Sequence, residues 1–127
     1  MTRTVIDANA FLRLLLDDIP SQADQIQKIL LEAKKNKKEL LVPQIIIFEI
    51  VFALEKYYHF PKQKIVDNIK SILAMRYFKI QDREIFKRAI DLFDKKNVSL
   101  TDCFLVYFVQ HNDANLFSFD KDLKKLQ

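Results

Sequence analysis

Four acidic residues stand in surroundings that suggest chemistry: Asp7, Glu49, Asp102 and Asp120. Asp7 and Asp120 follow short apolar stretches that predict strands, whereas Glu49 and Asp102 are flanked by hydrophobic residues in predicted helices. A buried carboxylate without a partner is so costly that it must find a cation, a hydrogen-bond donor or a proton. We therefore expect the four acids to share a metal site, and all-oxygen ligation favours Mg²⁺ or Mn²⁺ over zinc.

The elements that must position these acids alternate between strand and helix. Strands are expected at Thr4–Asp7, Leu40–Val42, Tyr77–Ile80 and Leu116–Phe119, and helices at Asn9–Leu16, from Pro20 to near Asn36, at Gln44–Tyr57, at Pro61–Met75, from Asp82 to Asn97, and after Ser99 and Asp120. This alternation predicts one domain, residues 1–127, with an α/β sandwich around a central, mainly parallel sheet. The carboxyl ends of parallel strands share one sheet edge, where Asp7 and Asp120 are both expected.

Composition narrows the classes of protein. Half of the 127 residues are hydrophobic, which is enough for one core. None is glycine, so ordinary P-loops and dinucleotide-binding fingerprints are excluded, and asparagines are expected at left-handed helix ends. The candidates for those ends are Asn36, Asn97, Asn112 and Asn115. The single cysteine, Cys103, excludes an intramolecular disulfide and a cysteine-rich zinc site, and we expect it in the core.

Charge and hydropathy suggest where the protein works. A net charge of +4 and a pI of about 9.1 mildly favour an anionic partner, although lysine runs at helix ends are more often solvated. The chain does not open with a basic region followed by an apolar segment, and Glu49 interrupts its longest apolar stretch. We expect a cytoplasmic protein that does not insert into a membrane.

Each acid also has an ordinary structural explanation. Asp7 and Asp120 fit helix N-caps, and Asp102 fits a capping box that opens with a serine three residues earlier. Glu49 could pair with Lys56 or another base. Taken singly, these explanations are the more common ones. Taken together, the acids favour a shared site. A helix cap does not require a preceding apolar strand, whereas Asp7 and Asp120 both follow apolar strands that are expected to end at the same sheet edge.

Short motifs follow one another along nearly the whole chain: Val5-Ile6-Asp7-Ala8-Asn9 with Phe11-Leu12-Arg13, Pro43 and Glu49, Leu100-Thr101-Asp102, and Ser118-Phe119-Asp120. Only their ordered combination is specific. It resembles the PIN-domain family and, in length and layout, the VapC-type toxins of toxin–antitoxin pairs. The resemblance implies a three-layer α/β/α sandwich whose central sheet has at least four strands. Related proteins commonly carry one more strand than this chain, so the last sheet edge is expected to be missing or supplied otherwise.

The same resemblance implies a Mg²⁺- or Mn²⁺-dependent endoribonuclease. Asp7, Glu49, Asp102 and Asp120 match the family's acidic quartet, which would hold one or two ions. Ser118 matches the small hydroxyl residue that often precedes the last acid by two positions. The implied partners are an RNA substrate, a small antitoxin protein and a second copy of the chain.

Several other side chains have two interpretations. Asn9 could hydrogen-bond an acid or a substrate phosphate, or simply start the first helix. Arg13, one helical turn further on, could contact phosphate or neutralise the acids, although a solvated surface position is slightly more common. Tyr57, Tyr58 and Phe60 could stack on bases, but we expect them to be buried.

Two other functions fit parts of the pattern. A non-catalytic PIN-like module that binds RNA or a protein would be expected to lose some of the four acids, and all four are present. A receiver-like signalling domain also gathers acids around Mg²⁺, but it needs a phosphorylatable aspartate after a middle strand, and Asp82 is poorly placed for that role. Metal-dependent RNA cleavage separates the enzyme from both alternatives.

Overall fold

A computed structural model describes residues 2–126 of the chain. Its elements are, in order, β1 (Thr2–Val5), α1 (Ala8–Leu16), α2 (Pro20–Lys34), β2 (Lys38–Val42), α3 (Gln44–Lys56), α4 (Lys62–Ala74), β3 (Phe78–Ile80), α5 (Arg83–Lys95), α6 (Leu100–His111) and α7 (Lys121–Lys125). No helix within the described residues is long and apolar enough to cross a membrane.

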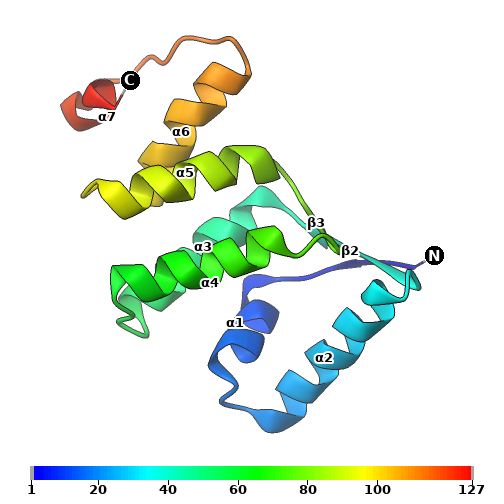
Figure 1. Ribbon diagram of the computed structural model, residues 1–127. Coiled ribbons are helices and arrows are strands. Elements are labelled where there is room, and N and C mark those ends of the chain that lie inside the picture. The colour runs from blue at the N-terminus through cyan, green and yellow to red at the C-terminus, as the bar shows by residue number, and fades with distance from the viewer. Residues whose placement is uncertain (1, 127) are drawn as a thin grey trace.

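The sheet is parallel and follows the order β1-β2-β3. Thr2 of β1 lies opposite Lys38 of β2, and Leu40 of β2 lies opposite Phe78 of β3. Figure 1 shows the strands beginning near the N-terminus of the chain and leading at their other ends toward α1, α3 and α5. We call these two sides of the sheet the amino edge and the carboxyl edge. The predicted α/β class and parallel sheet are confirmed.

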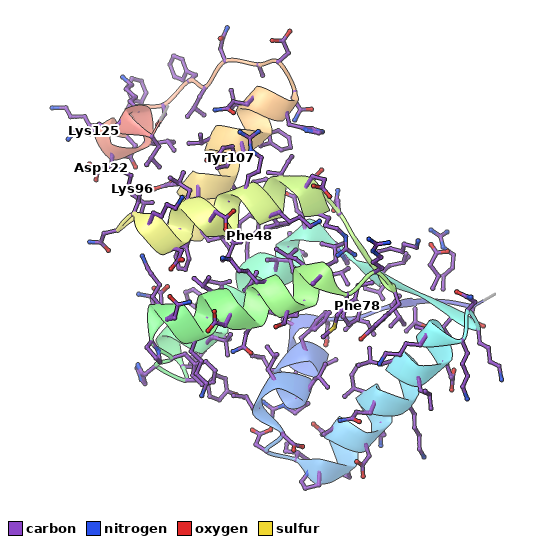
Figure 2. All side chains as sticks on the ribbon, in the orientation of Figure 1. Phe48, Phe78, Lys96, Tyr107, Asp122 and Lys125 are labelled. Atoms are coloured by element: carbon purple, nitrogen blue, oxygen red, sulfur yellow. The ribbon has the colours of Figure 1, made fainter. Side chains whose placement is uncertain are left out.

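The core is built on the central strand and the helices that follow it. Leu40 and Val42 of β2 are buried. Phe86 of α5 lies 5.2 Å from Phe48 of α3 and 4.8 Å from Phe104 of α6, measured between ring centroids. Figure 2 shows Phe48 where these helices meet. The helical spacing of four apolar residues predicts one apolar face for α5: Phe86, Ala89, Ile90 and Phe93. All four are buried, so this prediction is confirmed. These contacts fix the start of α6 against α3.

Because the chain has no glycine, other residues take the left-handed backbone positions. Asn36 does so after α2, as predicted, with a φ of 60°. The other three predicted asparagines do not. The remaining left-handed positions within residues 2–126 belong to Asp17, His59, Asp82 and Asp113. Asparagine and aspartate tolerate this conformation better than most residues because their short polar side chains bond locally to the backbone.

The predicted fourth strand, Leu116–Phe119, does not form. Residues 114–120 have no regular structure, and Phe117 and Phe119 are 86% and 87% exposed. The Asp120 amide donates to Ser118 Oγ, a bond that closes a local turn instead of extending a ladder. In Figure 1 this segment leads away from the sheet to α7. The expectation of at least four strands is therefore wrong for residues 2–126, and the outer side of β1 has no strand partner among them.

Candidate active site

The turn from β1 to α1 places two candidates at the carboxyl edge. Asp7 is the N-cap of α1, and its Oδ1 accepts a hydrogen bond of 2.9 Å from the Ala10 amide. Asn9 is the second residue of that helix, and both Asp7 and Asn9 are exposed. The structural explanation of Asp7 is thus confirmed. A cap engages one carboxylate oxygen and leaves the other able to accept a ligand.

Glu49 lies in the second turn of α3 and faces away from the core. Ile47 and Ile50 on either side of it are fully buried, whereas Glu49 is exposed. Successive helical side chains point about 100° apart, so apolar neighbours in sequence need not be neighbours of the carboxylate. The expectation of a buried Glu49 is wrong. So is its pairing with Lys56, whose ammonium lies 3.3 Å from Glu55.

Asp102 lies in the first turn of α6 and is half-buried. Ser99 is the N-cap of this helix, and its Oγ accepts a hydrogen bond of 3.1 Å from the Asp102 amide. That bond confirms the first half of the predicted capping box. It uses the backbone of Asp102 and leaves the carboxylate for another partner.

A hollow of about 530 Å³ joins α1, α3 and α6. Its lining includes Asn9, Glu49 and Thr101. Asp7 directly precedes another lining residue, Ala8, and Asp102 directly follows Thr101. Three of the four predicted acids therefore lie in this hollow or next to it in the chain, and we call it the acid hollow.

Asp120 does not join them. It caps α7, where its Oδ1 accepts a hydrogen bond of 2.9 Å from the Asp122 amide. Figure 1 shows α7 beyond α5 and α6 and not beside α1, and Figure 2 shows Asp122 well away from Phe78 of the sheet. Ser118 precedes this cap, and its Oγ accepts a hydrogen bond from the Asp120 amide. The chain that was expected to form a fourth strand, and so to carry Asp120 to the carboxyl edge, runs elsewhere.

The acids are less closely gathered than predicted. Within the part of the chain that the structure describes, no three His, Cys, Asp or Glu residues are close enough to hold a metal ion together. No charged residue there is buried. The expected burial of the acids is therefore wrong, and the four acids do not converge in this arrangement. The polar side chains of the acid hollow nevertheless offer carboxylate and amide oxygens, the ligands of hard cations.

Arg13 has a structural partner at each end of its guanidinium. Its Nη1 lies 3.1 Å from Asp18 Oδ2, and its Nη2 donates to Tyr58 Oη at 3.1 Å. The side chain is only 12% exposed, and its Nε is buried without a hydrogen-bond partner among residues 2–126. Arg13 thus ties α1 to the chain that follows α3, and its expected solvated position is wrong.

The acid hollow has an aromatic rim that the sequence did not predict. Tyr57 is 72% exposed and Phe52 is 55% exposed; both line the hollow, and their rings meet edge to face with centroids 6.0 Å apart. The expected burial of Tyr57 and Tyr58 is wrong, while Phe60 is half-buried. Helical spacing could have predicted that Phe52 lies beside Glu49, because it stands three residues after Glu49 and so shares its helix face.

Cys103 is buried in α6 beside Asp102, as predicted. Burial and, to a smaller extent, the neighbouring Asp102 carboxylate raise the pKa of its thiol to about 11. The thiol is therefore protonated at neutral pH and is a weak nucleophile.

Residues 4–127 match the family model of the PIN domain. The chain belongs to the PIN-domain family. The match includes all four acids and covers nearly the whole sequence, so the predicted family is confirmed. Membership of this family also removes the receiver-like alternative.

This PIN-domain chain is similar to a VapC ribonuclease of Aquifex aeolicus (strain VF5). The two are 26% identical over an alignment of 117 residues, and the alignment covers 89% of this chain and 87% of the relative. The predicted likeness to VapC-type proteins is confirmed. Because the similarity extends over most of both chains, it concerns the whole fold and not one short motif.

Proposed function

We propose that this protein is a metal-dependent endoribonuclease that hydrolyses RNA phosphodiester bonds as the toxin of a toxin–antitoxin pair. The observation that carries the proposal is the acid hollow. Asn9 and Glu49 both line it, and Asp7 and Asp102 lie next in the chain to other lining residues at the starts of α1 and α6. Membership of the PIN family and similarity to a VapC ribonuclease support nuclease chemistry at the level of the family.

The polar groups of the acid hollow fit a hard divalent cation. Mg²⁺ commonly keeps several waters and binds one or two carboxylates together with substrate phosphate. An open set formed by Asp7, Glu49 and Asp102 suits such a cation better than a closed cage, since none of these side chains is buried. We assign these three residues to one or two ions, Mg²⁺ or Mn²⁺, which they would hold in part through bound waters, because no three acids of residues 2–126 are close enough to bind an ion directly. When bound, the ion supplies activated water and offsets charge on the phosphate.

The chain's own groups bind and orient the RNA. Asn9 stands in the first turn of α1, near the positive end of the helix dipole, where its amide can donate to a phosphate oxygen. The half-buried Asp102 carboxylate accepts a hydrogen bond from the attacking water and orients it toward phosphorus. The exposed rings of Phe52 and Tyr57 offer stacking surfaces for bases next to the cleaved bond.

Asp120 and Ser118 have weaker support. The family resemblance assigns them to the same site, but Asp120 caps α7 outside the acid hollow. A catalytic role for either residue requires the chain after α6 to move from the arrangement described above. The cleavage assay below tests this assignment directly.

A small antitoxin protein is the proposed partner, and a homodimer is proposed by the same family resemblance. Exposed apolar side chains of α3, Ile45 at 59% and Phe52 at 55%, support contact with another protein. Both proposals place the protein in the cytoplasm, where its RNA substrate is made.

Cleavage of a long unstructured RNA by the purified chain tests the proposal. Mn²⁺ or Mg²⁺ should permit cleavage and a chelator should stop it. Asp7→Asn and Asp102→Asn should each lower the rate by about 100-fold or more with the fold retained. Asp24→Asn, which neutralises an exposed acid of α2, should leave the rate unchanged.

Two other results would change the assignment. An Asp120→Asn variant as inactive as Asp7→Asn would mean that α7 reaches the carboxyl edge during the reaction. RNA binding without cleavage in either metal would refute the enzyme and favour the non-catalytic module.

A further inference from the structure

The positive charge of the protein is concentrated at the amino edge of the sheet. Three stretches begin the strands there: residues 2–3, 32–39 and 76–79. They contain seven basic and two acidic residues, an excess of five positive charges, whereas the whole chain has a net charge of +4. The remainder of the chain, including the acid hollow, is therefore slightly negative overall.

Part of this charge surrounds a hollow of about 400 Å³, which we call the basic hollow. Its lining residues are Ala33, Lys34, Asn36, Lys38, Glu39, Arg76, Tyr77 and Lys79. The two carboxylates of the region each have one cationic neighbour: Glu32 lies 3.4 Å from Lys38, and Glu39 lies 3.8 Å from Arg3. No carboxylate of residues 2–126 lies within 4.0 Å of the other three cations in the lining, which are Lys34, Arg76 and Lys79. The basic hollow thus has cationic groups available for an anion.

Helix capping does not explain this cluster. Lys34 in the last turn of α2 has that ordinary explanation, because cations stabilise the carboxyl end of a helix. Arg76 and Lys79 do not, since they come from the turn before β3 and from β3 itself. Two segments about forty residues apart in sequence contribute cations to one concave surface. Only the pairing of β2 with β3 brings them together.

An aromatic ring stands among these cations. The Lys34 ammonium lies 5.4 Å from the centroid of the Tyr77 ring. Burial raises the pKa of the Tyr77 hydroxyl, so the ring stays neutral and adds no negative charge. Cations that follow a phosphate backbone, combined with an aromatic face for a base, are the usual components of a nucleic-acid surface.

We propose that the basic hollow is a second RNA-binding surface, which holds the phosphate backbone of the substrate away from the bond that is cut. This inference rests on the proposed function, since it takes RNA as the substrate. A strand residue advances about 3.3 Å, so the five residues of β2 separate the two edges of the sheet by about 16 Å. An RNA that reaches both hollows must extend along the molecule past the sheet. The surface contributes affinity and register, while the acid hollow carries the chemistry.

Binding measured without metal separates this proposal from cleavage. The probe is a fluorescent RNA stem-loop, titrated with the full chain in chelator at several salt concentrations. Lys34→Gln/Lys79→Gln removes two exposed charges from the basic hollow, and Lys28→Gln/Lys95→Gln removes two exposed charges from elsewhere on α2 and α5. The first variant should lower the slope of log K against log salt by about 0.7 to 0.9 for each lost phosphate contact. The control should change it by less than half as much.

Two results would overturn the proposal, and a third would overturn only the proposed function. The first is an equal change of slope in the two variants. If wild type still cleaves RNA in Mn²⁺, that result would refute this surface and leave the proposed nuclease activity unaffected. Polyglutamate of matched charge is the second probe: if it binds as tightly as the RNA, the surface serves an acidic protein instead. Failure of the wild type to cleave RNA that it binds through these lysines would refute the proposed function and leave the RNA surface standing.

Discussion

Removing the Ser99 hydroxyl and neutralising Asp102 should have different effects, although one hydrogen bond joins the two residues. Ser99 Oγ accepts from the Asp102 amide, so the hydroxyl belongs to the cap of α6. Ser99→Ala breaks that bond, whereas Asp102→Asn keeps it and changes only the carboxylate. The pair therefore distinguishes a helix cap from a metal ligand at the same turn.

The size of each effect follows from the structure. Loss of an N-cap costs about 1 kcal/mol. With an unfolding entropy of about 2.1 cal/mol/K per residue, a chain of 127 residues loses about 4 °C in Tm for each kcal/mol. Ser99→Ala should therefore melt about 4 °C lower, with or without metal.

Asp102→Asn should leave the metal-free protein within about 1 kcal/mol of wild type. The cost is small because loss of one negative charge in the first turn of a helix costs at most about 1 kcal/mol. Mn²⁺ at 100 times its Kd should stabilise wild type by about 2.7 kcal/mol, or about 10 °C in Tm. The Asn variant should lose most of that gain because an amide attracts the cation weakly.

Thermal melts of the three proteins in chelator and then in Mn²⁺ measure all of these quantities. Asp102 is not a metal ligand if wild type shows no metal-dependent rise in Tm, or if Asp102→Asn keeps the full rise. Either outcome would leave Asp102 with only a structural role at the start of α6. Ser99→Ala serves as the internal control, since its deficit should be the same in both solutions.

Two further predictions concern stability. The folded pKa of Cys103 is raised to about 11 from an ordinary value of 9.0, so unfolding releases a proton between these pH values and stability falls as pH rises through that range. Urea midpoints measured at pH 8, 9.5 and 11 should therefore fall more for wild type than for Cys103→Val. Parallel curves for the two proteins would contradict this. Arg83 donates to the carbonyls of Leu73, Met75 and Phe78 between α4 and β3. Arg83→Met should lower the free energy of unfolding in urea by about 2 to 4 kcal/mol, because three acceptors lose a charged donor. The exposed Arg88 is the matched control: Arg88→Met should cost under about 1 kcal/mol, and equal losses would show that the bonds of Arg83 contribute little.

Local features of this protein were readable from its sequence. The cap at Asp7, the Ser99 bond to Asp102 and the cap at Asp120 all formed where short motifs predicted them. Such bonds span two or three residues, so their partners are already neighbours in the chain. Hydrophobic periodicity was equally reliable for α5, because one face of a helix must be buried whatever covers it.

Exposure of the functional side chains depended on the tertiary structure. Apolar neighbours suggested that Glu49 is buried, yet the residue faces a hollow whose other walls come from α1 and α6. Tyr57 was expected in the core and lies on the rim of the same hollow. A sequence shows which residues share a helix face, but it does not show whether another element covers that face.

The short apolar stretch Leu116–Phe119 shows the same division at the level of the backbone. The pattern suits a strand, but a strand exists only if another strand accepts its hydrogen bonds. Here the chain leaves α6 on a path that does not reach β1, and Asp120 is carried away from the other acids with it. The amino acids alone determined the caps, the parallel α/β class and the family. The tertiary structure decided which acids share a hollow, because that depends on contacts between segments far apart in the chain.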